Sequence, residues 1–183
     1  MSGPTGNEPI AERDHLVQTS DVAREGWKRT LEDVEAMVDD RQDAGYETLF
    51  VPGANTAASA PDTGETDEWG LSYIVGSDKA EAFREFYEGT TFDETAVYQA
   101  TSTGYAFVVT ECIDHDTSWV LFVAGSYQLR FAGPLVRTAA DHGRMQTHLR
   151  TLDGTTLAVI EHDDVDAFFP DPERILAHEG RRS

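Results

Sequence analysis

Residues 105–124 read YAFVVTECIDHDTSWVLFVA, and this stretch decides the class of fold. Two apolar runs, AFVV at 106–109 and WVLFVA at 119–124, stand on either side of the polar residues DHDT at 114–117. Continuous apolar runs of this length are typical of strands that are covered on both faces. Asp is favoured in turns because its side chain accepts hydrogen bonds from nearby backbone N–H groups. We therefore predict a hairpin of two central strands.

A cluster of reactive side chains lies in the same hairpin. Five groups that can bind a metal or move a proton fall within six positions: Glu111, Cys112, Asp114, His115 and Asp116. Strand alternation puts Glu111 and Cys112 on opposite faces, so a single metal ion cannot be held by both. A transition-metal site needs roughly three or four converging ligands, and the local sequence offers no further one. We interpret the cluster as a solvated hairpin tip and expect neither a metal nor a cofactor.

The rest of the chain alternates helices with strands. Residues 20–44 carry Ala23, Trp27, Leu31, Val34 and Val38 at steps of three or four, which predicts an amphipathic helix. Further helices are predicted from Ser77 or Asp78 to Gly89 and from Pro134 to His142. Strands are predicted at 46–51, 69–75, 95–101, 105–112, 118–124, 145–152 and 155–162. This order predicts one α+β domain, with a mainly antiparallel sheet of about 5–7 strands and three to four helices packed on it.

Composition divides the chain into three parts. Residues 1–19 are rich in Gly, Pro and charge and are predicted to be a disordered N-terminal tail. Residues 20–170 form the predicted domain, and within it PGANTAASAPDTGETDE at 52–68 is interpreted as a mobile acidic loop or as a cover over a pocket. Residues 171–183 are expected to be a short C-terminal helix and tail.

The charge balance is strongly acidic. Asp and Glu number 34 against 14 Lys and Arg, which gives a net charge of −20. The acids are dispersed from Glu8 to Glu179, which is typical of proteins whose carboxylates hold water in molar salt, where the Debye length falls to about 3 Å. The alternatives are an acidic decoy or a face that docks a basic partner. No basic stripe is available for phosphates, so we expect no nucleic-acid partner.

Compartment follows from other features of the sequence. A single cysteine, Cys112, excludes an internal disulfide. The N-terminal residues lack the basic-then-apolar pattern of a signal peptide, and no stretch approaches the ~20 apolar residues of a membrane span. We expect a cytoplasmic protein that has no membrane partner.

The most coherent candidate site is a polar face on the hairpin at 145–162. Two strands joined by Asp153-Gly154 are a strong hairpin signal. A two-residue turn pairs His148 with Val159 and Arg150 with Leu157, and it places Glu161 diagonally within reach of His148. The face then binds an anion, lines a pocket or forms an exposed salt-bridged surface, and we call it the polar patch: Gln146, His148, Arg150 and Glu161.

Known catalytic and phosphate-binding motifs are not found. The chain has no G-x-S-x-G, no G-x-x-x-x-G-K-[ST], no G-x-G-x-x-G and no H-E-x-x-H. The run His162-Asp163-Asp164 follows a strand and precedes DAFFP, and Asp163 or Asp164 as a helix cap explains it without a metal.

Three segments carry a resemblance to known proteins: DAGYETLFVPG at 43–53, WGLSYIVGSD at 69–78 and HLRTLDGTTLAVIEHDDVDAFFP at 148–170. Together they resemble an uncharacterised family of small haloarchaeal proteins, a domain of unknown function, over roughly residues 22–170. The resemblance implies a saline habitat and a single domain, and it brings no assigned activity or functional residues.

Our leading hypothesis is a non-catalytic module that binds a partner protein or a small ligand. The alternatives are a small-molecule enzyme with a site around His148, Arg150 and Glu161, and a subunit that forms a homodimer through a strand edge. A ligand-binding protein or an enzyme predicts a pocket where His148, Arg150 and an aromatic such as Trp69 or Tyr127 converge. An interaction module predicts a flat, exposed apolar patch instead.

Overall fold

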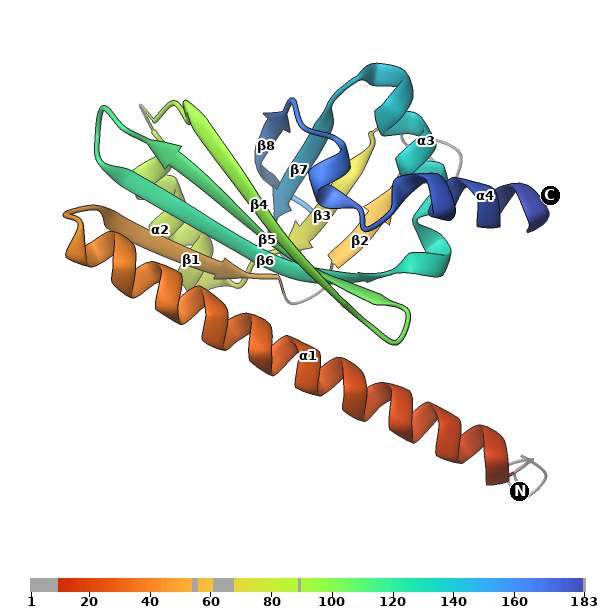
Figure 1. Ribbon diagram of the computed structural model, residues 1–183. Coiled ribbons are helices and arrows are strands. Elements are labelled where there is room, and N and C mark those ends of the chain that lie inside the picture. The colour runs from red at the N-terminus through yellow and green to blue at the C-terminus, as the bar shows by residue number, and fades with distance from the viewer. Residues whose placement is uncertain (1–9, 54–55, 61–67, 89, 183) are drawn as a thin grey trace.

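The computed structural model describes residues 10–53, 56–60, 68–88 and 90–182 (Figure 1). The described part contains four α-helices and eight strands, so the predicted α+β class is confirmed. No helix in these ranges is long and apolar enough to cross a membrane. The elements in chain order are α1 (Ile10–Asp43), β1 (Glu47–Pro52), β2 (Thr56–Ser59), β3 (Gly70–Ile74), α2 (Ser77–Tyr87), β4 (Glu94–Ser102), β5 (Tyr105–Asp114), β6 (Trp119–Gln128), the 3-10 turn η3 (Leu129–Phe131), α3 (Gly133–His142), β7 (Met145–Arg150), β8 (Thr156–His162), the 3-10 turn η4 (Asp166–Phe168) and α4 (Pro172–Arg182).

The strands divide into two sheets. The first sheet has the order β1-β6-β5-β4 and the second has the order β2-β3-β7-β8. Four of the six strand pairs are antiparallel, as predicted, while β1 pairs with β6 and β3 pairs with β7 in parallel. The second sheet packs on the face of β5 and β6 that α1 does not cover.

The predicted central hairpin is confirmed. β5 and β6 pair in register from Tyr105↔Gln128 to Asp114↔Trp119, and residues 115–118 form the turn. Every residue of β5 except Tyr105 is buried. Both faces of this hairpin therefore lie inside the protein.

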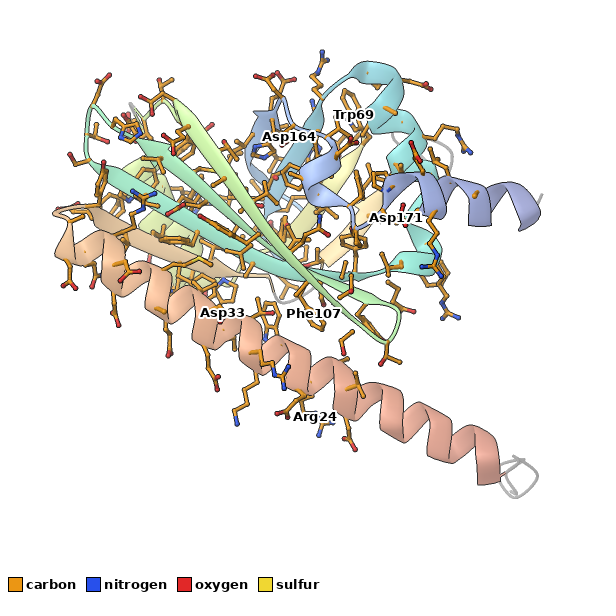
Figure 2. The ribbon with its side chains drawn as sticks, in the orientation of Figure 1. Arg24, Asp33, Trp69, Phe107, Asp164 and Asp171 are labelled. Atoms are coloured by element: carbon orange, nitrogen blue, oxygen red, sulfur yellow. The ribbon has the colours of Figure 1, made fainter. Side chains whose placement is uncertain are left out.

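Helix α1 covers one face of the first sheet, along which it runs diagonally (Figure 1). The predicted stripe is confirmed, since Val34 is fully buried and Trp27 and Val38 pack around it against Val109 and Phe122. Gly26 allows α1 to approach β5 closely. A Cβ at Gly26 would lie 2.5 Å from the Phe107 ring, which points from β5 toward the helix (Figure 2).

The helix begins earlier than the sequence suggested. It starts at Ile10, inside the segment predicted to be a disordered tail, so the predicted start at Ser20 is wrong. Its 34 residues correspond to about 51 Å at 1.5 Å per residue, and its N-terminal part extends past the first sheet (Figure 1). Helix propagation is favourable once a turn has formed, so a polar sequence without a breaker continues the helix upstream of its packed portion.

The main core lies between the facing surfaces of the two sheets. Val108, Cys112 and Leu121 of the first sheet belong to one buried cluster with Leu71 and Leu149 of the second sheet. Helices α2 and α3 and the segment around η4 complete this cluster through further buried side chains: Ala80, Phe83, Leu135, Val136, Ala139, Phe168 and Phe169.

Two local predictions fail for identifiable reasons. β2 lies within residues 52–68, where a structureless loop was predicted, and it pairs with β3; the rest of that stretch includes 54–55 and 61–67, outside the described residues. In the β7–β8 hairpin His148 pairs with Val159 as predicted, but Arg150 pairs with Thr156. Gly154 adopts φ 91° and extends the turn by one residue, in the way that a left-handed glycine follows a type I turn.

The contact between β3 and β7 leads to a first prediction. Gly70 has φ 131°, and a Cβ at this position would clash with the backbone carbonyl of Gln146. Because backbone cannot move aside cheaply, we expect Gly70→Ala to lower the free energy of unfolding by about 2–4 kcal/mol in denaturant titrations. Gly104→Ala is the matched control, since Gly104 has φ 83° but nothing within 4 Å of its added Cβ. Equal losses in both variants would contradict the close approach at Gly70.

Candidate functional site

The predicted polar patch lies on the face of the second sheet that points away from the main core. Gln146 stands opposite Glu161 in the strand register, and its Nε2 donates to Glu161 Oε1 at 3.2 Å. The Arg144 Nε group also donates to Glu161 Oε1, at 3.1 Å. Glu161 is thus joined to Gln146 and Arg144, and no hydrogen bond joins it to His148 among the described residues.

His148 and Arg150 have separate partners. The His148 ring is 3% exposed, and its Nε2–H donates to the backbone oxygen of Trp69 at 2.9 Å. Burial lowers the pKa of His148, against the opposing effect of the hydrogen bond to Trp69. Arg150 forms an ion pair with Glu68. Neither His148 nor Arg150 lines the cavities of about 370 Å³ and about 410 Å³ at the two edges of the second sheet.

Next to the patch, Trp69 packs against side chains that the sequence did not connect with it. The His142 ring stacks on the Trp69 ring at a centroid distance of 3.9 Å, and the Arg144 guanidinium lies 5.4 Å from the same ring. Trp69 is 8% exposed and belongs to the main core. Stacking on Trp69 and the ion pair between Arg144 and Glu161 therefore hold His142 and Arg144 in place at this surface.

The reactive cluster of the β5–β6 hairpin is split between the two faces, as strand alternation predicted. Cys112 faces the main core, where burial raises the pKa of its thiol to about 12. Glu111 faces α1 and is 3% exposed, so it is not part of a solvated tip. Asp114 is also buried, and its Oδ1 accepts hydrogen bonds from the backbone N–H groups of Asp116 and Thr117.

Glu111 and His115 are held by partners from distant parts of the chain. Arg41 at the end of α1 donates from Nε to Glu111 Oε2 at 2.8 Å, and the Tyr98 hydroxyl of β4 donates to Oε1 at 3.4 Å. His115 contacts Glu94 Oε1 through Nε2 at 3.0 Å, and its Nδ1 lies 3.1 Å from the Tyr46 hydroxyl. These bonds fix α1, β4 and the hairpin turn relative to one another.

A cavity of about 370 Å³ opens between the free edges of the two sheets, and we call it the edge cavity. β4 is the edge strand of the first sheet and β8 is an edge strand of the second. η4 lies beside β4, where the Gln99 side chain donates to the backbone oxygen of Ala167 at 3.0 Å. The cavity is lined by Phe92, Asp93, Glu94, Thr95, Ala96, Val97, Glu161, His162, Asp163, Asp164, Ala167 and Phe168.

His162 is the buried polar group of the edge cavity. Its ring is 4% exposed, lies 4.9 Å from the Phe168 ring and places Nε2 2.8 Å from Thr147 Oγ1. Its Nδ1 is buried without a hydrogen-bond partner among the described residues. Burial lowers the pKa of His162 to about 4, so the ring is neutral at pH 7.

Of the two neighbouring aspartates, Asp164 bonds to the backbone of η4. Asp164, which Figure 2 labels, accepts a hydrogen bond from the backbone N–H of Ala167 at 3.3 Å, while the N-cap position of η4 is Val165 and not an aspartate. Within the described residues, no three His, Cys, Asp or Glu side chains come together as a set that can hold a metal ion.

A second cavity of about 410 Å³ lies at the opposite edge of the second sheet, beside β2, and we call it the uncharged cavity. The Tyr127 hydroxyl, at its wall, donates to the backbone oxygen of Phe168 at 2.7 Å, and burial raises the Tyr127 pKa. The cavity is lined by Gly53, Thr56, Ala57, Ala58, Tyr105, Ser126, Tyr127, Gln128 and Phe131.

The Arg41–Glu111 pair generates a second prediction. Glu111 is 4% exposed as a side chain, so Arg41→Met leaves a buried carboxylate without its cation. We expect the free energy of unfolding to fall by about 2–4 kcal/mol, and the double variant Arg41→Met/Glu111→Gln to recover part of this loss. Arg24→Met is the control on the same helix, because its pair with Asp21 is exposed and contributes about 0–1 kcal/mol. Similar losses for Arg41→Met and Arg24→Met would show that the pair is not buried in solution.

A third prediction concerns the pKa values of His162 and His115, which NMR titration of the ring protons measures. Burial keeps the His162 pKa near 4, while the unfolded chain titrates near about 6.5, so stability falls as the pH drops through that interval. The bond to Glu94 raises the His115 pKa, so its contribution to stability is present at low pH and is lost as the pH rises through the raised value. Glu94→Gln is expected to bring the His115 pKa down and to leave His162 unchanged. A His162 ring that titrates near its ordinary value would contradict its burial.

Comparison with known proteins adds family membership to this geometry. Comparison with curated proteins and with solved structures gives no match. A family model described as a family of unknown function, DUF7529, matches residues 13–170. The matched range runs from α1 through β8 and η4, and so includes the polar patch and the twelve described lining residues of the edge cavity. The chain therefore belongs to the DUF7529 family of unknown function.

Proposed function

We propose that this protein is a small-ligand-binding module without catalysis of its own, and that its site is the edge cavity. The observation that carries the proposal is the buried Nδ1 of His162, which has no partner in the described structure and belongs to a side chain that lines the cavity. A buried polar group without a hydrogen bond costs roughly 1–3 kcal/mol. A ligand that bonds to this nitrogen removes that cost and so gains affinity from it.

The position of the cavity supports the same proposal. β4 and β8 are both edge strands, and the backbone groups on their free sides have no strand partner within their sheets. The volume of about 370 Å³ falls at the small end of the range for ligand sites, roughly 300–1,000 Å³. Apolar groups from Val97 and Phe168 adjoin polar groups from Thr95 and His162, the mixture that fixes the orientation of a bound molecule.

A protein-interaction surface has less support among the described residues. The large hydrophobic side chains that are exposed come from separate elements, namely α2, β4, η3, the β7–β8 turn and β8. Scattered single residues are normal on a protein surface, whereas a docking face needs a contiguous patch. The exposed residues are Phe86, Tyr98, Phe131, Leu152 and Val159.

An enzyme at the polar patch also has less support. His148 uses Nε2 to bind a backbone oxygen, and Arg150 is paired with Glu68. Catalysis at the patch needs His148 to exchange protons with a bound molecule, and His148 lines neither the edge cavity nor the uncharged cavity. Glu161 is shared between the patch and the rim of the edge cavity, so we assign it to ligand binding.

Habitat and compartment belong to the same proposal. The dispersed acidic residues, 34 in all, fit a cytoplasmic protein that works in concentrated salt, as in the haloarchaeal family that the sequence resembles. The free cysteine, Cys112, is buried and fits a compartment in which disulfides are not used.

A fourth prediction tests the site with thermal unfolding in about 2 M KCl against amines, amino acids, sugars and nucleosides. A ligand at a hundred times its dissociation constant is expected to stabilise the protein by about 2.7 kcal/mol, which raises Tm by roughly 5–10 °C. Ala167→Leu fills the edge cavity and is expected to abolish the shift. The ligand is expected to be recovered chemically unchanged.

Ala57→Leu is the matched control, because it adds the same volume to the lining of the uncharged cavity. If the ligand still raises Tm in Ala167→Leu but not in Ala57→Leu, the binding site is the uncharged cavity. Shifts lost with His148→Ala and kept in Ala167→Leu would support the polar patch instead.

A further inference from the structure

We propose that the ligand of the edge cavity is a small organic cation that carries an ammonium group next to an apolar or aromatic body. This inference rests on the proposed function, since it names the ligand class of the same site. It depends on the charge of the lining, on the cavity's aromatic side chains and on the unpartnered nitrogen of His162.

The described lining of the edge cavity is acidic and contains no lysine or arginine. Five of its twelve described residues are Asp or Glu. Outside the lining, Arg144 pairs with Glu161 and His115 pairs with Glu94. The other three carboxylates form no ion pair within the described residues: Asp93, Asp163 and Asp164.

This acidity is not a simple consequence of the overall charge of the chain. The uncharged cavity is slightly larger, and none of its nine described lining residues is charged. The two cavities therefore differ in chemistry although they belong to one acidic protein. An anionic ligand is repelled at the edge cavity, and a cation is attracted.

His162 provides the second and independent observation. It is 4% exposed, lines the cavity and leaves Nδ1 without a partner. In the tautomer whose Nε2–H donates to Thr147 Oγ1, Nδ1 carries a lone pair. An ammonium N–H is a donor that matches this acceptor, and the carboxylates at the rim accept its other protons.

The apolar part of the ligand has matching partners. Phe168 lies against His162 at 4.9 Å between ring centroids, and Phe92 lines the same cavity. Aromatic rings attract cations and also pack against apolar groups. A bare metal ion is a poor match, because no described set of three His, Cys, Asp or Glu residues converges to hold one.

The fifth prediction uses three probes that share one ring and differ in charge: benzylamine, benzyl alcohol and benzoate. Amide shifts in ¹H–¹⁵N spectra measure binding at Ala96, Val97, Asp164 and Ala167. We expect benzylamine to bind at least about tenfold more tightly than benzyl alcohol, and benzoate to bind most weakly. The preference for benzylamine over benzyl alcohol is expected to shrink between about 0.5 M and about 2 M KCl, because salt screens exposed charges.

Matched variants separate the effect of the carboxylates in the cavity lining from the effect of the overall charge of the protein. Asp163→Asn removes an acid of the lining, and Asp166→Asn makes the same change at an exposed residue outside the lining. Asp163→Asn is expected to weaken benzylamine binding about threefold or more with little effect on benzyl alcohol, and Asp166→Asn to change neither.

The outcomes distinguish this inference from the proposed function. If benzylamine and benzyl alcohol shift the same cavity amides with equal affinity, the edge cavity binds ligands but the cation preference is wrong. Equal weakening by Asp163→Asn and Asp166→Asn would also overturn the preference. If neither these probes nor the wider ligand panel shifts the cavity amides, the proposed function itself fails.

Discussion

β5 and β6 pair over ten residue positions, and most side chains on both faces of this pair are withdrawn from solvent. A strand pair of this kind cannot be stable as one layer of a two-layer protein, because one of its apolar faces would remain in water. It needs a covering layer on each side. Helix α1 supplies one layer, and the second sheet with α2 and α3 supplies the other. The three-layer arrangement is thus a consequence of the apolar runs at 106–109 and 119–124.

The same requirement explains why a charge is buried in this protein. Glu111 occupies a position of β5 that α1 covers, so its carboxylate is buried whether or not it has a partner. Arg41 and Tyr98 satisfy it from two other elements. A buried carboxylate is stable only where such partners reach it. The ion pair therefore favours one position of the C-terminal half of α1 along the first sheet.

Periodicity was sufficient to predict the elements that bury a continuous face. The helical stripe at Trp27, Val34 and Val38 and the alternation around Glu111 and Cys112 both appear in the structure. Elements without such a face were missed or misplaced. β2 consists of TAAS, which has no apolar alternation, and it exists because β3 offers it a hydrogen-bonding edge. The extra turn residue between Arg150 and Thr156 arises from the left-handed Gly154, and a sequence alone does not distinguish the two kinds of Asp-Gly turn.

The candidate site was harder to predict because it lies between the edge strands of two sheets and contains no recognised sequence motif. Its lining comes from 92–97 and 161–168, two segments that share no strand pair and belong to different sheets. In the run His162-Asp163-Asp164, the hydrogen bond from Ala167 to Asp164 accounts for one of the three residues. The local sequence does not show that β4 lies beside the same residues, because that contact is long-range. His162 faces the main core and Glu161 faces the opposite side of β8, so strand alternation assigns the two side chains to different surfaces. Both side chains nevertheless line the edge cavity. Where two sheets diverge, a site can use both faces of an edge strand, and periodicity alone then assigns its residues to different places.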